Sequence, residues 1–228
     1  MNSALLSLLH LTDPTLPIGG FSHSAGLETY VQQGFVKDAA TAKEFVVQML
    51  SQNLKYTDAA LVSLTYDAAN KNDLQRILLL DAECTAVKLP KEMRQASNKL
   101  GLRLMKIFQP LNKNVLLADY AAAIKKQEAI GHYCIAFALY AQSLGISKQD
   151  ALNGFYYNAA VGFVTNAVKL VPLSQQSGQE ILFSIHGLID ELVKQALEPN
   201  EDLIGLCCTG FDIKSMQHER LYSRLYMS

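Results

Sequence analysis

Histidine and cysteine side chains are the usual ligands of transition metals in proteins. The chain has five histidines, and none has a second histidine two, three or four residues away. Two ligands on one helix face need such a spacing, so the histidines predict no helical metal site. The adjacent pair Cys207-Cys208 makes a poor chelate, because neighbouring side chains point in different directions. We therefore expect no metal site, and we interpret His132 and His186 as hydrogen-bonded helix residues.

The sequence lacks the common signatures of enzymes. No GxxxxGK[ST] loop, GxGxxG run or GxSxG elbow occurs in the chain. Neighbouring carboxylates such as Asp81 with Glu83, and Asp190 with Glu191, are interpreted as residues of solvated helix faces. We predict no catalytic residue and no cofactor, and so no enzyme. A helical enzyme or ligand-binding protein with a pocket between two apolar helices is the minor alternative.

The composition narrows the class of protein further. The 228 residues carry a formal net charge of −1, which gives no electrostatic basis for binding nucleic acid. Half of them are hydrophobic and 18% are charged, below the usual ~25%, so we expect a partner to cover some apolar surface. Apolar stretches are shorter than the roughly 20 residues of a membrane span, so we expect no membrane association. Four scattered cysteines and no secretory leader favour a reduced, cytoplasmic protein.

Apolar residues at helical spacing run through the whole sequence, without the alternation that is typical of strands. Caps and breakers divide the pattern into about eight to ten helices, and we predict a single all-α domain. The expected helices lie near residues 5–11, 24–33, 38–50, 56–69, 74–86, 91–108, 119–144, 147–170 and 174–197. Two stretches, 131–141 and 159–168, are apolar on nearly every side, which predicts helices at the centre of the fold.

The run from Pro14 to Glu28, PTLPIGGFSHSAGLE, interrupts the helical pattern with two prolines and two adjacent glycines. Proline does not fit inside a helix and glycine permits backbone angles closed to other residues, so the run predicts an ordered turn before a short helix. We expect Phe21 to pack there as an anchor. Glu28 and Tyr30 are candidates for an outer face that meets a partner, with Tyr30 equally compatible with the core.

Two further segments contain candidate contact residues. Lys169 ends an apolar helix, where a lysine either satisfies the last carbonyls or projects toward a partner. We divide the chain into an all-α domain at 1–204 and a tail at 205–228. The tail, which includes Tyr222 and Arg224, is too aromatic for a solvated terminus, so we expect it to dock. Its arginines and tyrosines favour a partner over the body of the same chain as the docking surface.

Four blocks of sequence together resemble the UreF family of urease accessory proteins, and they span almost the whole chain. They are PTLPIGGFSHSAGLE at 14–28, KEMRQAS at 91–97 with Gly101, NAVKLVPL at 166–173 with Gln175 and Gln179, and the tail segment 212–225. The first and last blocks are the most specific. Lys169 departs from the arginine frequent in the family, and Ser174 from its common glycine, while Gln217 and Met227 make this tail less basic.

The resemblance implies an all-α protein that assists urease maturation without catalysing a reaction. Such proteins associate with UreD, also called UreH, and with the GTPase UreG on apo-urease, where GTP hydrolysis is coupled to nickel insertion. They are dimeric in the complex with UreD. We therefore expect an adaptor whose partner contacts include Glu28, Tyr30, Lys169, Tyr222 and Arg224. The alternative is a GTPase-activating protein for UreG, in which Arg224 or Lys169 contacts the transferred phosphate.

Overall fold

The computed structural model describes residues 3–206 and 208–228, and within them the protein is helical and has no β-strand. The elements in chain order are α1 (Ala4–Leu11), η1 (Gly20–Ser22), α2 (Leu27–Gln32), α3 (Ala39–Gln48), η2 (Met49–Ala59), α4 (Ala60–Asn70), α5 (Leu74–Val87), α6 (Lys91–Phe108), α7 (Val115–Lys125), α8 (Tyr133–Ser143), α9 (Lys148–Leu170), α10 (Gln175–Ser184), α11 (His186–Ala196), η3 (Glu201–Leu203) and α12 (Thr209–His218). The predicted all-α class is confirmed.

Several helices begin beside a capping side chain, close to the predicted starts. Asp38, Asp73, Ser147 and Ser174 each accept a hydrogen bond from the backbone N–H three residues further on. This satisfies one of the amide donors that every helix start leaves without an intrahelical partner. The starts of α3, α5, α9 and α10 are therefore specified locally.

The twelve α-helices of the described residues exceed the expected eight to ten, because two long predicted helices are each broken and the tail contributes α12. The predicted helix 119–144 is wrong: α7 ends at Lys125 and α8 begins at Tyr133. Between them Gln127 and Gly131 have φ angles of +65° and +88°, which a right-handed helix cannot contain. The predicted helix 174–197 is likewise divided at Ile185 into α10 and α11.

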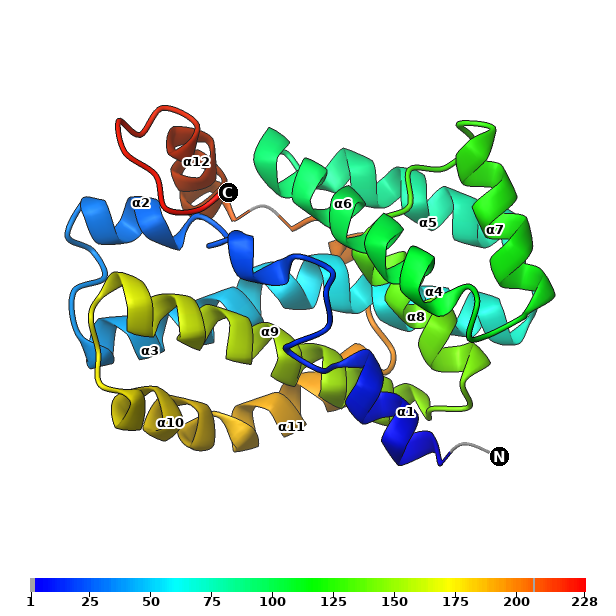
Figure 1. The fold of residues 1–228 in the computed structure, drawn as a ribbon, viewed down its shortest axis with the longest axis horizontal. Coiled ribbons are helices and arrows are strands. Elements are labelled where there is room, and N and C mark those ends of the chain that lie inside the picture. The colour runs from blue at the N-terminus through cyan, green and yellow to red at the C-terminus, as the bar shows by residue number, and fades with distance from the viewer. Residues whose placement is uncertain (1–2, 207) are drawn as a thin grey trace.

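Helix α8 forms the centre of the molecule, as the apolar stretch 131–141 predicts. Every residue from Cys134 to Ala141 is at most 1% exposed. The helix packs between α4 and α6, while α9 runs beside it and contacts α3, α10 and α11 (Figure 1). The stretch 159–168 is only partly central, because Ala160, Val164 and Ala167 are buried but other positions of α9 reach the surface.

Helices α3, η2 and α4 follow one another without a break from Ala39 to Asn70. The middle of this rod, Met49–Ala59, is a π-helix, a rare geometry that is frequent at functional sites. Its last turn contains the buried Asp58.

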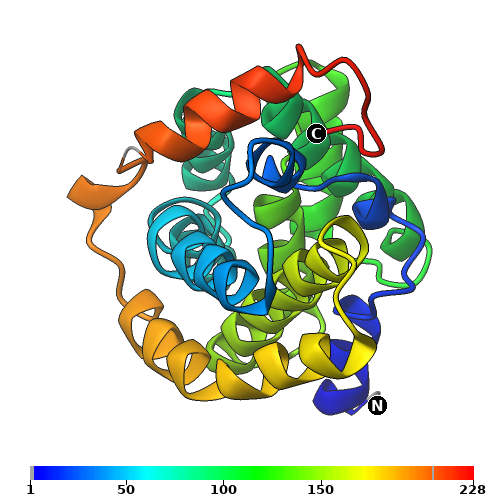
Figure 2. The same ribbon diagram turned by 90° about the vertical axis from the view of Figure 1, so that its left-hand side faces the viewer.

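The chain after α11 crosses the molecule and brings α12 against α2 and α6 (Figure 2). The tail thus docks on its own chain; whether it also binds a partner stays a prediction. None of the helices among the described residues combines the length and the hydropathy that crossing a bilayer demands.

Candidate functional site

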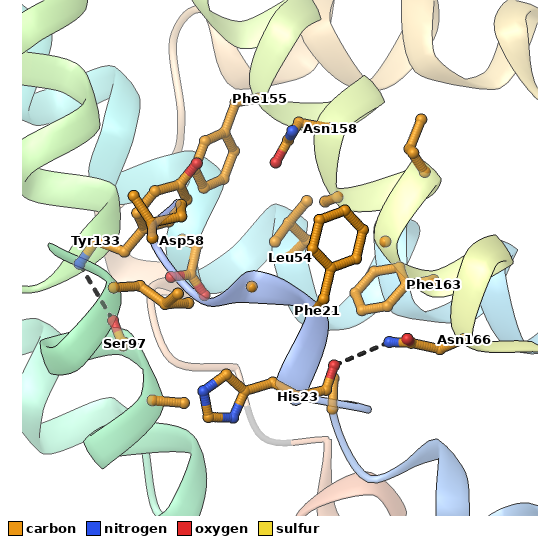
Figure 3. A pocket seen from close by; sticks show the side chains of 18 of the residues that line it. Phe21, His23, Leu54, Asp58, Ser97, Tyr133, Phe155, Asn158, Phe163 and Asn166 are labelled. Carbon is orange, nitrogen blue, oxygen red and sulfur yellow. Dashed lines mark hydrogen bonds between the residues drawn. The ribbon is translucent and has the colours of Figure 1, made fainter. Parts of the chain in front are cut away.

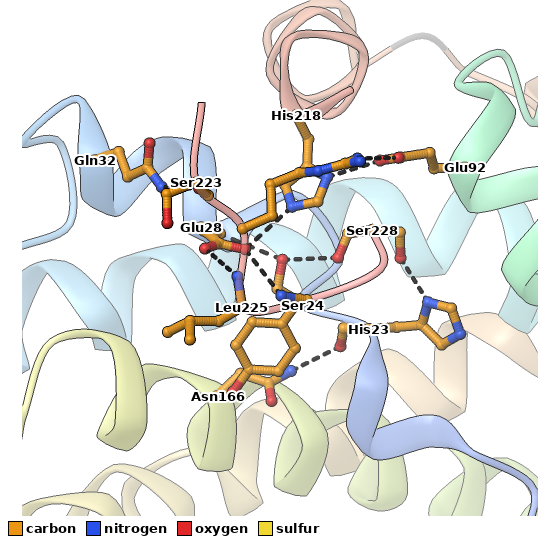
Figure 4. A network of polar contacts seen from close by, with 12 residues as sticks. His23, Ser24, Glu28, Gln32, Glu92, Asn166, His218, Ser223, Leu225 and Ser228 are labelled. Carbon is orange, nitrogen blue, oxygen red and sulfur yellow. Dashed lines mark hydrogen bonds and ion pairs between the residues drawn. The ribbon is translucent and has the colours of Figure 1, made fainter. Parts of the chain in front are cut away.

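Glu28 lies at the centre of a polar network that fixes the last residues of the chain (Figure 4). Its side chain is buried, with 3% of the residue exposed. One carboxylate oxygen accepts a hydrogen bond from the backbone N–H of Leu225 at 2.8 Å, and the other accepts from Tyr226 at 3.2 Å. The second oxygen also lies 3.2 Å from Nε2 of His218 in α12. A single carboxylate of α2 therefore connects two separate parts of the tail.

Glu92, in the first turn of α6, completes this network. Its Oε2 lies 2.7 Å from Nδ1 of His218, and its Oε1 accepts a hydrogen bond from the guanidinium of Arg224 at 2.7 Å. His218 is fully buried between the two carboxylates, whereas the side chain of Arg224 is 40% exposed. We call Glu28, Glu92, His218 and Arg224 the tail anchor.

The last residues also pair with the N-terminal turn through backbone hydrogen bonds. The N–H of Met227 donates to the carbonyl of Ser22 at 2.8 Å, and the N–H of Ser24 donates to the main-chain oxygen of Ser228 at 2.6 Å. The hydroxyl of Ser24 donates to the same oxygen, and Nδ1 of His23 lies 2.8 Å from the Ser228 hydroxyl. The tail segment 219–228, which we call the strap, is thus held from Arg224 to Ser228.

Two more contacts draw other elements into the same region. The side-chain amide of Asn166 in α9 donates to the carbonyl of His23 at 2.8 Å. Gly26 has φ +76°, and a Cβ there would lie 2.7 Å from the hydroxyl of Ser215 in α12. Only glycine fits both this backbone angle and this close approach. Glu28, Glu92, Asn166 and the strap each belong to a different one of the four sequence blocks, so all four blocks meet in this region.

A cavity of about 220 Å³ lies beside this region and is lined mainly by apolar side chains (Figure 3). Phe21 and His23 line one part of it, and Asp58 and Lys88 line another. Burial and the positive charges of Lys99 and Arg103 lower the pKa of His23. His23 therefore belongs both to the cavity wall and to the contact with the strap.

Asp58 and Lys88 form an ion pair at the cavity wall, with 2.6 Å between Nζ and Oδ2. Burial alone raises the pKa of Asp58, but the charge and hydrogen bond of Lys88 outweigh it and keep the pKa below its usual value. Burial lowers the pKa of Lys88, but the Asp58 carboxylate and the neighbouring Cys84 and Cys134 together outweigh it, so the pKa is raised. The pair is ionised near neutral pH.

The five candidate contact residues occupy different environments. The expectation that Glu28 faces outward is wrong, because its oxygens are needed to fix the strap. Tyr30 is half-buried, with its ring edge-on to Phe45 at 5.3 Å between centroids. Tyr222 and Lys169 are exposed, and Arg224 is partly exposed within the tail anchor. Contact of these five with partners stays a prediction.

Phe21 does not pack as the predicted anchor. It is 49% exposed, and Nζ of Lys169 lies 5.8 Å from the centre of its ring. The aromatic ring and the cation at the end of α9 therefore form an exposed pair.

Asp81 is the buried carboxylate that the sequence reasoning missed. It was expected on a solvated face, and it is fully buried in α5. Its oxygens accept from the hydroxyl of Tyr120 at 2.7 Å and from the backbone N–H groups of Ile130, Gly131 and His132 at 2.5, 3.1 and 3.1 Å. A signal was present: Asp81 lies on the same helix face as two apolar residues four before and three after it, Ile77 and Cys84.

Cys84 and Cys134, fifty residues apart in sequence, meet behind Asp58. Their sulfur atoms lie 3.6 Å apart and both residues are fully buried. A hydrogen bond from the Cys134 thiol lowers the pKa of Cys84, while burial raises the pKa of Cys134. His132 is hydrogen bonded as expected, with its ring nitrogens 2.8 Å from the Thr85 hydroxyl and 3.1 Å from that of Ser97.

Comparison with known proteins decides the family. The sequence profile of the UreF family matches residues 36–186. The chain belongs to the UreF family. A urease accessory protein UreF from Actinobacillus pleuropneumoniae serotype 5b (strain L20) is 50% identical over 222 residues, which cover 97% of this chain and 98% of that protein.

Two other UreF proteins show how far this similarity extends. The urease accessory protein UreF of Haemophilus influenzae (strain PittEE) is 50% identical over 97% of this chain and 94% of its own length. That of Bacillus sp. (strain TB-90) is 36% identical over 98% and 99%. The similarity to these UreF proteins therefore covers the tail of the chain as well as its helical body.

Proposed function

We propose that this protein is a cytoplasmic adaptor of urease maturation that binds UreD (UreH) and the GTPase UreG and brings them to apo-urease for GTP-dependent nickel insertion. Membership of the UreF family supports the role in urease maturation. The observation that carries the proposal is the convergence of all four sequence blocks on the tail anchor and strap. This convergence builds a defined surface next to exposed contact residues.

The strap presents large apolar side chains on a backbone that is already fixed. Tyr222 is fully exposed, and Leu225 and Met227 are 79% and 55% exposed. Phe21 belongs to the N-terminal turn that pairs with the strap, and Nζ of Lys169 lies 5.8 Å from the centre of its ring. Aromatic and aliphatic side chains beside cations are typical of binding hot spots, and a fixed backbone reduces the entropy lost on binding. We call these five residues the strap face.

Co-purification with UreD and UreG tests the adaptor role. Tyr222→Ala removes an exposed ring and Arg224→Ala removes a guanidinium from the tail anchor, so both are expected to reduce recovery of the partners. The matched control is Arg220→Ala, an exposed arginine on the same tail outside the anchor. Melting temperatures within a few degrees of the parent chain show that the fold is intact. Full recovery of both partners by the Tyr222 and Arg224 variants contradicts the proposal.

The same complexes address the homodimer and the GTPase-activating alternative. We propose two copies of this chain in the complex with UreD, which its mass in solution measures. The guanidinium of Arg224 is bound to Glu92, so it must leave the tail anchor before it reaches a phosphate. An adaptor leaves the GTP turnover of UreG unchanged when added without UreD and apo-urease. A rate increase that Arg224→Ala or Lys169→Ala abolishes favours the alternative.

A further inference from the structure

The buried cysteine pair lies in a group of side chains with the composition of a metal site. One ligand atom from each of Asp58, Cys84 and Cys134 falls within 4.8 Å of the other two. All three residues are buried. They come from three different helices, η2, α5 and α8, whose packing fixes their positions. We propose that Asp58, Cys84 and Cys134 form a binding site for a thiophilic divalent cation of the Zn²⁺ type.

The spacing of the two sulfur atoms fits tetrahedral coordination. Two thiolates that each lie about 2.3 Å from one Zn²⁺ at the tetrahedral angle are roughly 3.8 Å apart. The observed Sγ–Sγ distance is 3.6 Å. A disulfide requires about 2.05 Å, so the pair is placed nearer to the separation of two metal ligands than to a covalent bond.

The chemistry of the donors selects the cation. Thiolate ligands favour zinc and other soft or borderline cations over Mg²⁺ and Ca²⁺, which prefer oxygen. Asp58 supplies one oxygen, leaving the fourth tetrahedral position for water. Asp58 also lines the cavity, together with Ser97 and His23, so the proposed site adjoins that cavity through its oxygen ligand.

Lys88 explains how such a site is tolerated without an ion. Buried charges are costly unless they are balanced. In the structure the ammonium of Lys88 balances the Asp58 carboxylate. A divalent cation that displaces two thiol protons leaves this balance unchanged, because two positive charges leave as two enter. The group is therefore neutral overall in both states.

A second layer of contacts orients the ligands. His132 lies two residues before Cys134, at the N-cap of α8, and its ring is fixed by the hydroxyls of Thr85 and Ser97. Thr57 donates from its hydroxyl to Oδ2 of Asp58 at 3.2 Å. Such outer contacts hold metal ligands in place and are a regular part of metal sites.

Zn²⁺ titration of the reduced full-length protein against a chromophoric chelator tests the site. We expect one tightly bound Zn²⁺ per chain and a raised melting temperature, because the cation binds only the folded state. Cys84→Ser and Cys134→Ser preserve side-chain size and are expected to weaken binding by more than the roughly 10–100-fold that loss of an outer contact costs. The control is Cys208→Ala, which changes the cysteine immediately before α12. This variant should retain the bound ion.

Co²⁺ provides a spectroscopic readout that does not depend on stability. Bound between two thiolates it gives the intense visible bands of tetrahedral geometry together with thiolate charge transfer, and both should vanish in Cys84→Ser. Circular dichroism of each ion-free variant verifies the fold. Zn²⁺ binding that persists in both serine variants, or a weak octahedral Co²⁺ spectrum in the parent, overturns the proposal. Either result leaves the adaptor proposal intact, because recovery of UreD and UreG is measured separately.

Discussion

Asp81 and Glu28 use the same chemistry in two regions with different consequences. Each is a buried carboxylate that accepts backbone N–H groups from a segment far away in sequence. Asp81 holds the loop between α7 and α8, which enters the core helix of the molecule. Glu28 holds the strap, whose side chains are mostly exposed. The same arrangement stabilises an interior loop in one region and secures an exposed segment of the tail in the other.

The consequences differ because the attached segments differ in burial. The loop held by Asp81 cannot leave without moving α8, which is the most buried helix. The strap can leave by breaking the bonds to Glu28, Glu92 and the N-terminal turn, and Tyr222 and Leu225 lose almost no contact when it does. We infer that the Asp81 region opens only with global unfolding, whereas the strap opens locally.

Asp81→Ala is expected to have the largest effect. It leaves the buried N–H groups of Gly131 and His132 and the buried hydroxyl of Tyr120 without an acceptor, and each such group costs about 1–3 kcal/mol. We expect the free energy of unfolding to fall by about 4 kcal/mol or more, measured by urea denaturation. Glu83→Ala, on the same helix but partly exposed, should change it by less than about 0.5 kcal/mol. Equal effects of the two substitutions would remove the special status of Asp81.

Glu28→Gln is expected to release the strap and leave the body folded. The amide cannot accept from Leu225, Tyr226 and His218 together, so the loss is about 1–3 kcal/mol and confined to the tail. Hydrogen exchange should accelerate at the amides of Leu225 and Tyr226 and stay slow at His132. Acceleration at all three amides would show that the two regions open together, which would contradict local opening of the strap.

The sequence predicted what depends on neighbouring residues. Caps such as Asp38 and Asp73 and the apolar run of α8 act within a few residues, so pattern and propensity suffice for them. The sequence did not predict features that depend on contacts between residues far apart along the chain. The break between α7 and α8 is stabilised by Asp81, which lies about fifty residues away, and Glu28 is buried by a strap about two hundred residues later. The family resemblance named the right blocks without revealing that they meet.

The smallest expected effect concerns pH and acts through His23, which contacts Ser228 in the strap. Burial, together with Lys99 and Arg103, lowers its pKa against the opposing charge of Glu92. The unfolded chain, with a histidine pKa of about 6.5, therefore binds more protons than the folded chain as pH falls below that value. Stability that is fully present above pH ~6.5 is then lost as pH falls toward the folded pKa.

His23→Asn removes this titration and keeps a polar atom near the Ser228 hydroxyl. The stability difference between the parent chain and the variant should shrink between pH 7.5 and 5.5, by less than about 1 kcal/mol because the ring is partly solvated. Proton NMR of the His23 ring should give a titration midpoint below ~6.5. A midpoint above that value would mean that Glu92, and not the two cations, dominates at the strap, and the strap would then tighten in acid instead of loosening.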